Sequence, residues 1–175
     1  DYWAAMSLMG RFAAANHELI HRHIAWGLGA EVVLDLENHH NFAWREVHDG
    51  EELVVHRKGA TPAGKGVLGI IPGSMATPAF IVRGRGAAAA LDSASHGAGR
   101  LMSRRRARAT LSWSEAKRRL AAAKVTLVSA DLDEAPMVYK DIERVMAAQQ
   151  ELVEVLARFH PRLVKMAPPG HRAED

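Results

Sequence analysis

The stretch Ser93-Ala-Ser-His-Gly-Ala-Gly-Arg-Leu-Met-Ser-Arg104 places a single histidine, His96, among two glycines, three serines and two arginines. Glycine lets backbone N–H groups approach a ligand closely. The forked guanidinium donors of arginine match phosphate oxygens, and a neutral imidazole can attack phosphorus or bind a metal ion. The stretch therefore predicts a phosphate-binding turn that carries a nucleophile.

The length and composition are those of a soluble globular domain. The chain has 175 residues, of which 48% are hydrophobic and 25% are charged, and this size suffices for one domain with one core. No apolar run approaches the length of a membrane span, so we expect a cytoplasmic protein with no membrane partner. The chain contains no cysteine, which excludes disulfides and thiolate-bound metal within it.

Positive charge is concentrated in one part of the chain, although the net charge is only +3. Such a cluster favours polyanionic partners, including RNA. The alternative is a solvated helix face with no partner. The clustered residues are Arg100, Arg104, Arg105, Arg106, Arg108, Lys117, Arg118 and Arg119.

Helical patterns occur near both ends of the chain and in its middle. Apolar residues recur at helical spacing over residues 2–28. A capping box at residues 112–115 predicts that a helix begins there, and residues 97–108 could open another at the glycine-rich turn. Residues 139–159 are strongly amphipathic and predict a long C-terminal helix.

Between these helices, short apolar runs alternate with glycine turns in a pattern typical of β-strands. The Asp49-Gly50 pair is a hairpin signal. Together these patterns predict one mixed α+β domain, followed by a polar tail over residues 167–175. The expected strands are residues 31–36, 43–48, 52–57, 67–71, 79–83 and 124–129.

Three further segments are candidates for a site. His39 and His40 are adjacent in an extended run and point to opposite faces, so at most one of them faces a given site. Residues 55–61 join Arg-Lys to a glycine turn, which indicates either an anion site or a charged hairpin edge. Residues 70–77 form an apolar strand that enters a Pro-Gly-Ser turn, and such turns often do no more than reverse the chain.

Taken in order, five of these runs resemble the RtcB-type RNA ligase family, and the motif around His96 is the most specific of them. The run Ala135–Gln149 also resembles the C-terminal helix of that family. The resemblance implies that residues 1–166 are the carboxy-terminal part of an RtcB-like ligase domain. The five runs are His-His-Asn (39–41), Arg-Lys-Gly-Ala (57–60), Ile-Ile-Pro-Gly-Ser-Met (70–75), Ile-Val-Arg-Gly (81–84) and Ser-His-Gly-Ala-Gly-Arg-Leu-Met-Ser-Arg (95–104).

The resemblance implies a GTP- and Mn²⁺-dependent RNA ligase of the kind used in tRNA splicing and RNA repair. Members of the family join an RNA 3′-phosphate or 2′,3′-cyclic phosphate end to a 5′-hydroxyl end. A histidine first takes GMP from GTP as a phosphoramidate and then passes it to the RNA 3′-phosphate. The 5′-hydroxyl attacks the activated phosphate, and GMP leaves.

Catalytic roles follow from the resemblance residue by residue. His96 matches the guanylylated nucleophile, and His40 matches a metal-binding histidine. Arg100 and Arg104 are expected to hold nucleotide or RNA phosphates, and Lys58 is expected to help them. These assignments are implied by the motif match and not by spacing alone.

The resemblance also implies a nucleotide-binding set. Tyr139 would pack on the base, and Lys165 resembles a near-terminal lysine that reads guanine. Ala79 stands where the family usually carries a serine. The other positions that match nucleotide-binding residues are Asn41, Pro72, Gly73, Ser74, Met75, Gly97, Ala98 and Gly99.

Members of the family are more than twice as long as this chain, and their first half supplies an aspartate, a cysteine and two further histidines as metal ligands. One histidine cannot hold Mn²⁺ against water, because manganese binds weakly and needs several ligands. We therefore expect the missing N-terminal half to be a required partner and the isolated chain to be inactive.

Two other functions remain open at this stage. The chain could be a non-catalytic remnant that binds nucleotide or RNA. It could also be a stand-alone metal hydrolase that uses the helical His17-x-x-x-His21 pair, although the other residues of that helix are ordinary core residues.

Overall fold

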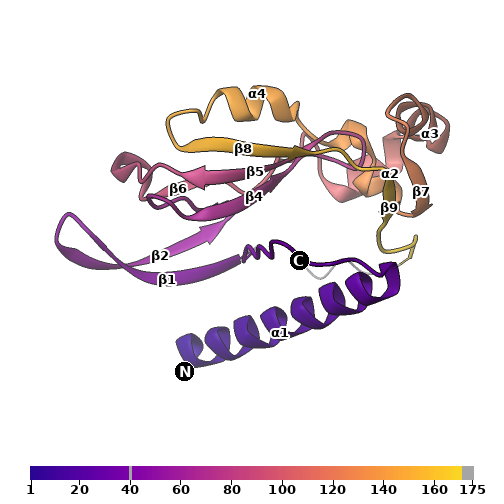
Figure 1. Ribbon diagram of the computed structural model, residues 1–175. Coiled ribbons are helices and arrows are strands. Elements are labelled where there is room, and N and C mark those ends of the chain that lie inside the picture. The colour runs from indigo at the N-terminus through magenta and orange to yellow at the C-terminus, as the bar shows by residue number, and fades with distance from the viewer. Residues whose placement is uncertain (40, 171–175) are drawn as a thin grey trace.

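Helices and short strands alternate along the chain, as Figure 1 shows for the computed structural model, which describes residues 1–39 and 41–170. This mixture confirms the predicted α+β class. The helical elements are α1 (Tyr2–Leu28), η1 (Ala88–Ala90), α2 (Arg104–Thr110), α3 (Trp113–Ala122), η2 (Leu132–Glu134), η3 (Pro136–Val138) and α4 (Ile142–Ala147). The strands are β1 (Asn41–His48), β2 (Glu51–Lys58), β3 (Ala60–Pro62), β4 (Leu68–Pro72), β5 (Ala79–Gly84), β6 (Ser93–Ser95), β7 (Thr126–Ser129), β8 (Val153–Phe159) and β9 (Leu163–Lys165).

The strands pair in small sheets. β4, β5 and β8 form an antiparallel sheet with β5 in the centre, β3 pairs with β6, and β7 pairs in parallel with β9. β1 and β2 form the predicted hairpin, and Asp49 and Gly50 both have positive φ, at 52° and 83°. Two positive φ values in a row define the tight hairpin turn that Asp-Gly favours.

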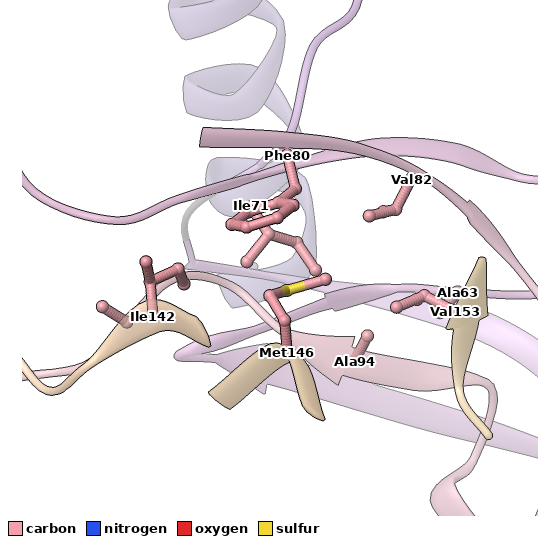
Figure 2. Packing of buried hydrophobic residues seen from close by; sticks show 9 residues of the cluster. Ala63, Ile71, Phe80, Val82, Ala94, Ile142, Met146 and Val153 are labelled. Atoms are coloured by element: carbon pink, nitrogen blue, oxygen red, sulfur yellow. The ribbon is translucent and has the colours of Figure 1, made fainter. Parts of the chain in front are cut away.

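The main core lies between the β4–β5–β8 sheet and α4, and Figure 2 shows its packing. Phe80 and Ile71 are fully buried, and Ile142 and Met146 of α4 pack against them. Each fully buried side chain of this size contributes about 1.5–3 kcal/mol to folding. Ala98 belongs to the same core cluster, so the loop that carries His96 is anchored in the main core.

Most of the predicted elements are present. The strand predictions for residues 43–48, 52–57, 67–71 and 79–83 are confirmed to within a residue or two. The capping box is confirmed because the Ser112 hydroxyl accepts the Glu115 N–H at 3.4 Å and α3 begins at Trp113. The glycine turn itself is not helical; α2 begins only at Arg104, with Ser103 as its N-cap.

The predicted C-terminal helix over residues 139–159 is wrong. Helix α4 ends at Ala147, and residues 153–159 form strand β8, which pairs with β5. The apolar residues of this segment fit the period of a helix as well as that of a strand. Ile142 and Met146 of α4 and Val153 of β8 all belong to the same core cluster. A longer helix would leave one edge of β5 without hydrogen-bond partners, and pairing with β8 satisfies those backbone groups.

The predicted strand at residues 31–36 is also absent. Its apolar side chains are exposed, Val33 at 91%. The edge of β4 is instead met by the Asn38 side-chain amide, which donates to Ile70 O at 2.6 Å and accepts from Ile70 N at 3.4 Å. An amide side chain offers the same donor and acceptor as a backbone unit, so it caps the edge that a strand would have extended.

Helix α1 is present as predicted, but it has no fully buried residue. In Figure 1 it runs along the side of the molecule opposite α4. It contacts β1, where the Phe42 ring lies so close to Gly10 that a Cβ there would be 2.6 Å from the ring. Within the described part of the chain, no helix is long and apolar enough to cross a membrane. Residues 171–175 of the predicted polar tail lie outside the described residues.

Candidate active site

Backbone hydrogen bonds to two other segments hold the loop that follows β6 and carries His96. The His96 N–H donates to Gly59 O at 3.1 Å, and the Ala98 N–H donates to Pro72 O at 3.0 Å. The Ser95 hydroxyl donates to Gly97 O at 2.6 Å. The side chain of His96 is half-buried, with its Nε2 atom shielded from solvent. The ring therefore projects from a backbone whose position is fixed by two other segments.

Glycine is required where this loop crosses the turn after β4. A Cβ on Gly97 would lie 3.0 Å from Pro72 O, and a Cβ on Gly73 would lie 2.4 Å from Thr77 Oγ1. The Ser74 N–H donates to that same Thr77 oxygen at 2.7 Å. The absence of a side chain at Gly97 lets the loop lie against Pro72, and the absence of one at Gly73 leaves room for Thr77 and Pro78 within the turn.

Met75 fastens this turn to a second hydrophobic cluster. Its side chain is buried with Leu120, Val125 and Ala130, and Val164 of β9 packs against the same cluster. Met75 therefore anchors the turn through its side chain. Lys165, next to Val164, is exposed and lies opposite Ser129 in the β7–β9 pair.

The β1–β2 hairpin ends next to the His96 loop. Asn41 is paired with Lys58 across the hairpin, and Lys58 directly precedes the Gly59 carbonyl that holds His96. Asn41 Oδ1 lies 2.8 Å from His56 Nε2. His39 stacks on Phe42 with ring centroids 4.7 Å apart. His40, the predicted metal ligand, lies outside the described residues.

The segment around Tyr139 contacts the C-terminal end of the glycine loop. An isolated β-bridge joins Tyr139 to Arg100, and the Leu101 N–H donates to Val138 O at 2.7 Å. The Arg100 guanidinium lies 5.5 Å from the centre of the Tyr139 ring. The Tyr139 hydroxyl donates to Glu134. Burial, followed by this hydrogen bond to a carboxylate, raises the pKa of the Tyr139 phenol above its ordinary value of 10.0.

The two predicted phosphate-binding arginines already contact carboxylates. Arg100 Nη1 lies 3.3 Å from Glu134, and Arg104 bonds both Glu134 and Asp133, the latter at 3.0 Å. Arg108 bonds the same Asp133 carboxylate at 2.9 Å. A phosphate that contacts these guanidinium groups must share them with the 133–134 carboxylates.

Arg57 is a structural residue, although the sequence pattern grouped it with Lys58 as an anion site. It is 2% exposed and donates to both carboxylate oxygens of Glu46, at 2.6 and 2.8 Å. Its remaining donors reach Ser93 and the Leu91 carbonyl. The strand alternation contained the signal, since Arg57 shares the inward face of β2 with buried Val55. Lys58, on the other face, is exposed.

Two residues near the site were missed by the sequence analysis. Gln149 is 5% exposed, and its Oε1 accepts the Ser95 N–H at 2.9 Å, which fixes the strand immediately before His96. Lys140 donates its N–H to Gly99 O at 3.0 Å. Neither residue carries a local signal, because both reach the loop from a distant part of the sequence.

The remaining candidate residues either belong to the central sheet or do not form a metal-binding group. Ala79 is a strand residue of β5, paired with Pro72 on one side and Phe159 on the other. Over residues 1–39 and 41–170, no group of three or more metal-ligating side chains could hold an ion. The His17 and His21 rings lie 6.0 Å apart between centroids, and this pair gives the hydrolase alternative no support.

The site is thus a half-buried histidine in a glycine loop, and backbone hydrogen bonds join this loop to the segments of Gly59, Pro72 and Tyr139. The model of the family "tRNA-splicing ligase RtcB" matches residues 1–166, and the chain belongs to this family.

Curated relatives agree with this assignment. The RNA-splicing ligase RtcB of Escherichia coli K12 is 40% identical over 167 residues, which are 89% of this chain and 41% of that protein. The tRNA-splicing ligase RtcB of Nanoarchaeum equitans is 36% identical over 197 residues, covering 92% of this chain and 41% of that protein. The Thermococcus kodakarensis tRNA-splicing ligase RtcB is 31% identical, with 92% and 40% covered. The chain therefore spans about two fifths of the length of these relatives.

Proposed function

We propose that this chain is the histidine-bearing part of a GTP- and Mn²⁺-dependent RNA ligase that joins an RNA 3′-phosphate or 2′,3′-cyclic phosphate end to a 5′-hydroxyl end, as in tRNA splicing and RNA repair. The observation that supports this most directly is the set of backbone hydrogen bonds around His96. They bring the segments of Lys58, Pro72 and Tyr139 to one loop, although these segments are far apart in sequence.

The chemistry needs one nucleophile and three displacements at phosphorus. An unprotonated nitrogen of His96 attacks the α-phosphorus of GTP, so that a P–N bond forms and pyrophosphate leaves. An oxygen of the RNA 3′-phosphate then attacks the same phosphorus and breaks the P–N bond; a 2′,3′-cyclic end must first be opened by water, which attacks its phosphorus and releases the 2′-hydroxyl. Finally, the 5′-hydroxyl oxygen attacks the activated 3′-phosphate, loses its proton and displaces GMP.

The loop is suited to hold the phosphate groups during these steps. Among the described residues, the N–H groups of Gly97 and Gly99 donate to no backbone or side-chain acceptor. Free amides beside a fixed nucleophile stabilise charge that develops on phosphate oxygens. Phosphoryl transfer depends mainly on such alignment and charge neutralisation.

The described residues do not by themselves fit a manganese site. No group of three or more ligating side chains occurs among them, and manganese requires several oxygen or nitrogen ligands. In this proposal, His40 supplies one ligand and the remainder of the ligase supplies the others. No step of the reaction is therefore assigned to a metal held by this chain alone.

An unpartnered apolar surface supports the presence of a further polypeptide. The side chains of Phe12, Ile20 and Ile24 on α1 are exposed, as are those of Val32 and Val33. A groove of about 830 Å³ lies between α1, the 30–36 segment and Ile70 and Ile81. Exposed apolar area of this extent marks an interaction site. We propose that the rest of the ligase, as found in the longer relatives, covers it.

Guanylylation tests this function. GTP labelled at the α-phosphate, with Mn²⁺, should give acid-labile and alkali-stable labelled protein when the chain is mixed with the part of the E. coli ligase that lies outside the match. His96→Ala should abolish the label, and His160→Ala, an exposed histidine between β8 and β9, should leave it unchanged. The isolated chain should not become labelled.

Two outcomes contradict the proposal. Equal labelling of the His96→Ala protein would exclude His96 as the nucleophile. Labelling of the unaided chain would show that it needs no further metal ligands. The alternative, a remnant that binds nucleotide or RNA without catalysis, is favoured by the missing metal set among the described residues; it predicts salt-sensitive binding of GTP or RNA and no label under any condition.

A further inference from the structure

The side chain of Lys140 lies along the glycine loop. A Cβ built on Gly99 would lie 3.7 Å from Lys140 Nζ, 3.8 Å from Cε and 3.9 Å from Cδ. The backbone of Lys140 is held to the same glycine by a 3.0 Å hydrogen bond to its carbonyl. Gly99 has φ +74°, a conformation that glycine adopts readily. The ammonium group is therefore positioned over the loop that carries His96.

This lysine differs from the nearby arginines in its charge environment. Arg100 and Arg104 contact the 133–134 carboxylates. Lys140 is exposed and, within the described range, no carboxylate lies within ion-pair distance of it. Its neighbour Asp141 is engaged elsewhere, since that carboxylate accepts the Glu143 N–H at 3.0 Å as the N-cap of α4 and lies 3.7 Å from Arg144.

The Lys140 ammonium thus lies beside Gly99, in the loop that also carries the Gly97 and Gly99 N–H groups. Backbone amides and an ammonium group on one loop can bind an oxyanion together, because each oxygen can accept several hydrogen bonds. Tyr139 precedes Lys140 and carries the ring expected to pack on the base. A phosphate group held by the loop would lie within reach of the lysine and would neutralise its charge.

We propose that Lys140 is a phosphate-binding residue of the His96 loop, and this inference rests on the proposed function of that loop. The ligand is a phosphate group, supplied either by the triphosphate of the nucleotide or by the 3′-phosphate end of RNA. Lys140 contributes one charge-assisted hydrogen bond to it. Removing such a bond reduces affinity by about ten-fold.

Titrations of the full 175-residue chain distinguish the two sources of phosphate. The first ligand is inorganic tripolyphosphate, with guanosine as the phosphate-free control. The second is a short RNA that ends in a 3′-phosphate, with the same RNA ending in a 3′-hydroxyl as its control. Binding is measured by calorimetry for wild type, Lys140→Met, Lys140→Arg and Lys65→Met, the last replacing an exposed lysine between β3 and β4.

Lys140→Met should lower the affinity for tripolyphosphate or for the 3′-phosphate RNA about ten-fold. Its affinity for guanosine and for the 3′-hydroxyl RNA should be unchanged. Lys140→Arg should stay close to wild type, and Lys65→Met should not weaken binding of the same ligand. The ligand that responds identifies the source of the phosphate. A midpoint of urea unfolding that is equal for Lys140→Met and wild type shows that charge and not packing was lost.

The inference is overturned if Lys140→Met binds both phosphate ligands within two-fold of wild type, if Lys65→Met loses as much affinity as Lys140→Met, or if wild type binds neither ligand. Failure of the proposed function is a separate result. Loss of phosphate binding in Lys140→Met without any His96 labelling would retain the phosphate site and remove the ligase assignment. Labelling of His96 that does not depend on Lys140 would retain the ligase assignment and remove the phosphate-binding role of Lys140.

Discussion

The Ala98 N–H donates to the Pro72 carbonyl at 3.0 Å and thereby joins the loop of the candidate nucleophile to the turn that follows β4. Ala98 is 3% exposed and packs in the main core with Ile71 and Phe80. The position of the His96 backbone is therefore set by the sheet and not by a mobile surface loop.

Gly97→Ala should reduce guanylylation of the complemented ligase by at least about ten-fold, because the new Cβ would lie 3.0 Å from Pro72 O and displace the loop. The label from α-labelled GTP measures this. Gly27→Ala is the control, since nothing lies within 4 Å of its Cβ. Unchanged labelling in Gly97→Ala would show that close packing on Pro72 is not needed.

Gln149→Leu should destabilise the chain by about 1–3 kcal/mol, because it leaves the buried Ser95 N–H without its acceptor. Urea unfolding followed by circular dichroism gives the free energy of unfolding. The neighbouring Gln150 is exposed, and Gln150→Leu should change the free energy by less than about 0.5 kcal/mol. Equal effects of the two substitutions would contradict the role assigned to Gln149.

Glu46→Gln should lower the free energy of unfolding by about 2 kcal/mol or more, because Arg57 is almost fully buried and would lose its charged partner. The Arg57 hydrogen bonds hold the pKa of the Glu46 carboxyl below its ordinary value of 4.5. This contribution is complete above pH 4.5 and is lost as the pH falls through the lower folded pKa.

Urea unfolding at neutral and acidic pH tests this, and the difference between wild type and Glu46→Gln should narrow toward acid. Glu154→Gln is the control, since its 3.3 Å pair with Arg83 is exposed and is worth less than about 1 kcal/mol. A constant difference across the pH range would contradict the assignment.

Tyr139 should titrate well above its ordinary value of 10.0, because burial and the Glu134 hydrogen bond both raise its pKa. The unfolded chain loses this proton near the ordinary value, so the stabilising contribution is complete below that pH and is lost as the pH rises through the folded pKa. Phenolate absorbance of the folded chain should therefore contain a step above the ordinary value. Tyr139→Phe should remove this step, and its persistence in Tyr139→Phe would refute the prediction.

Local patterns predicted those elements that local chemistry specifies. The Asp49-Gly50 turn and the capping box at residues 112–115 were readable because one or two side chains decide the backbone there. The segment 153–159 was misread as helix because its fate depends on the open edge of β5, which no local pattern reveals. In the same way, Asn38 took the edge of β4 that residues 31–36 were predicted to fill.

Local sequence likewise revealed only some features of the candidate site. The glycine loop around His96 was conspicuous in the sequence, because glycine and arginine near a histidine are a compositional signal. The internal pairing of Arg57 with Glu46 and the approach of Lys140 to Gly99 were not. Each joins segments that only the fold brings together, and formal charge alone does not distinguish a solvent-exposed cation from one that is already neutralised.

The exposure of helix α1 affects how well the chain withstands proteases. A helix without a fully buried residue gains little from tertiary packing, so its backbone hydrogen bonds open often unless something covers them. Proteases cleave such segments readily. If the rest of the ligase covers α1, as proposed above, a copy of this polypeptide without that cover should lose about thirty N-terminal residues to proteases, while the sheet that anchors His96 persists.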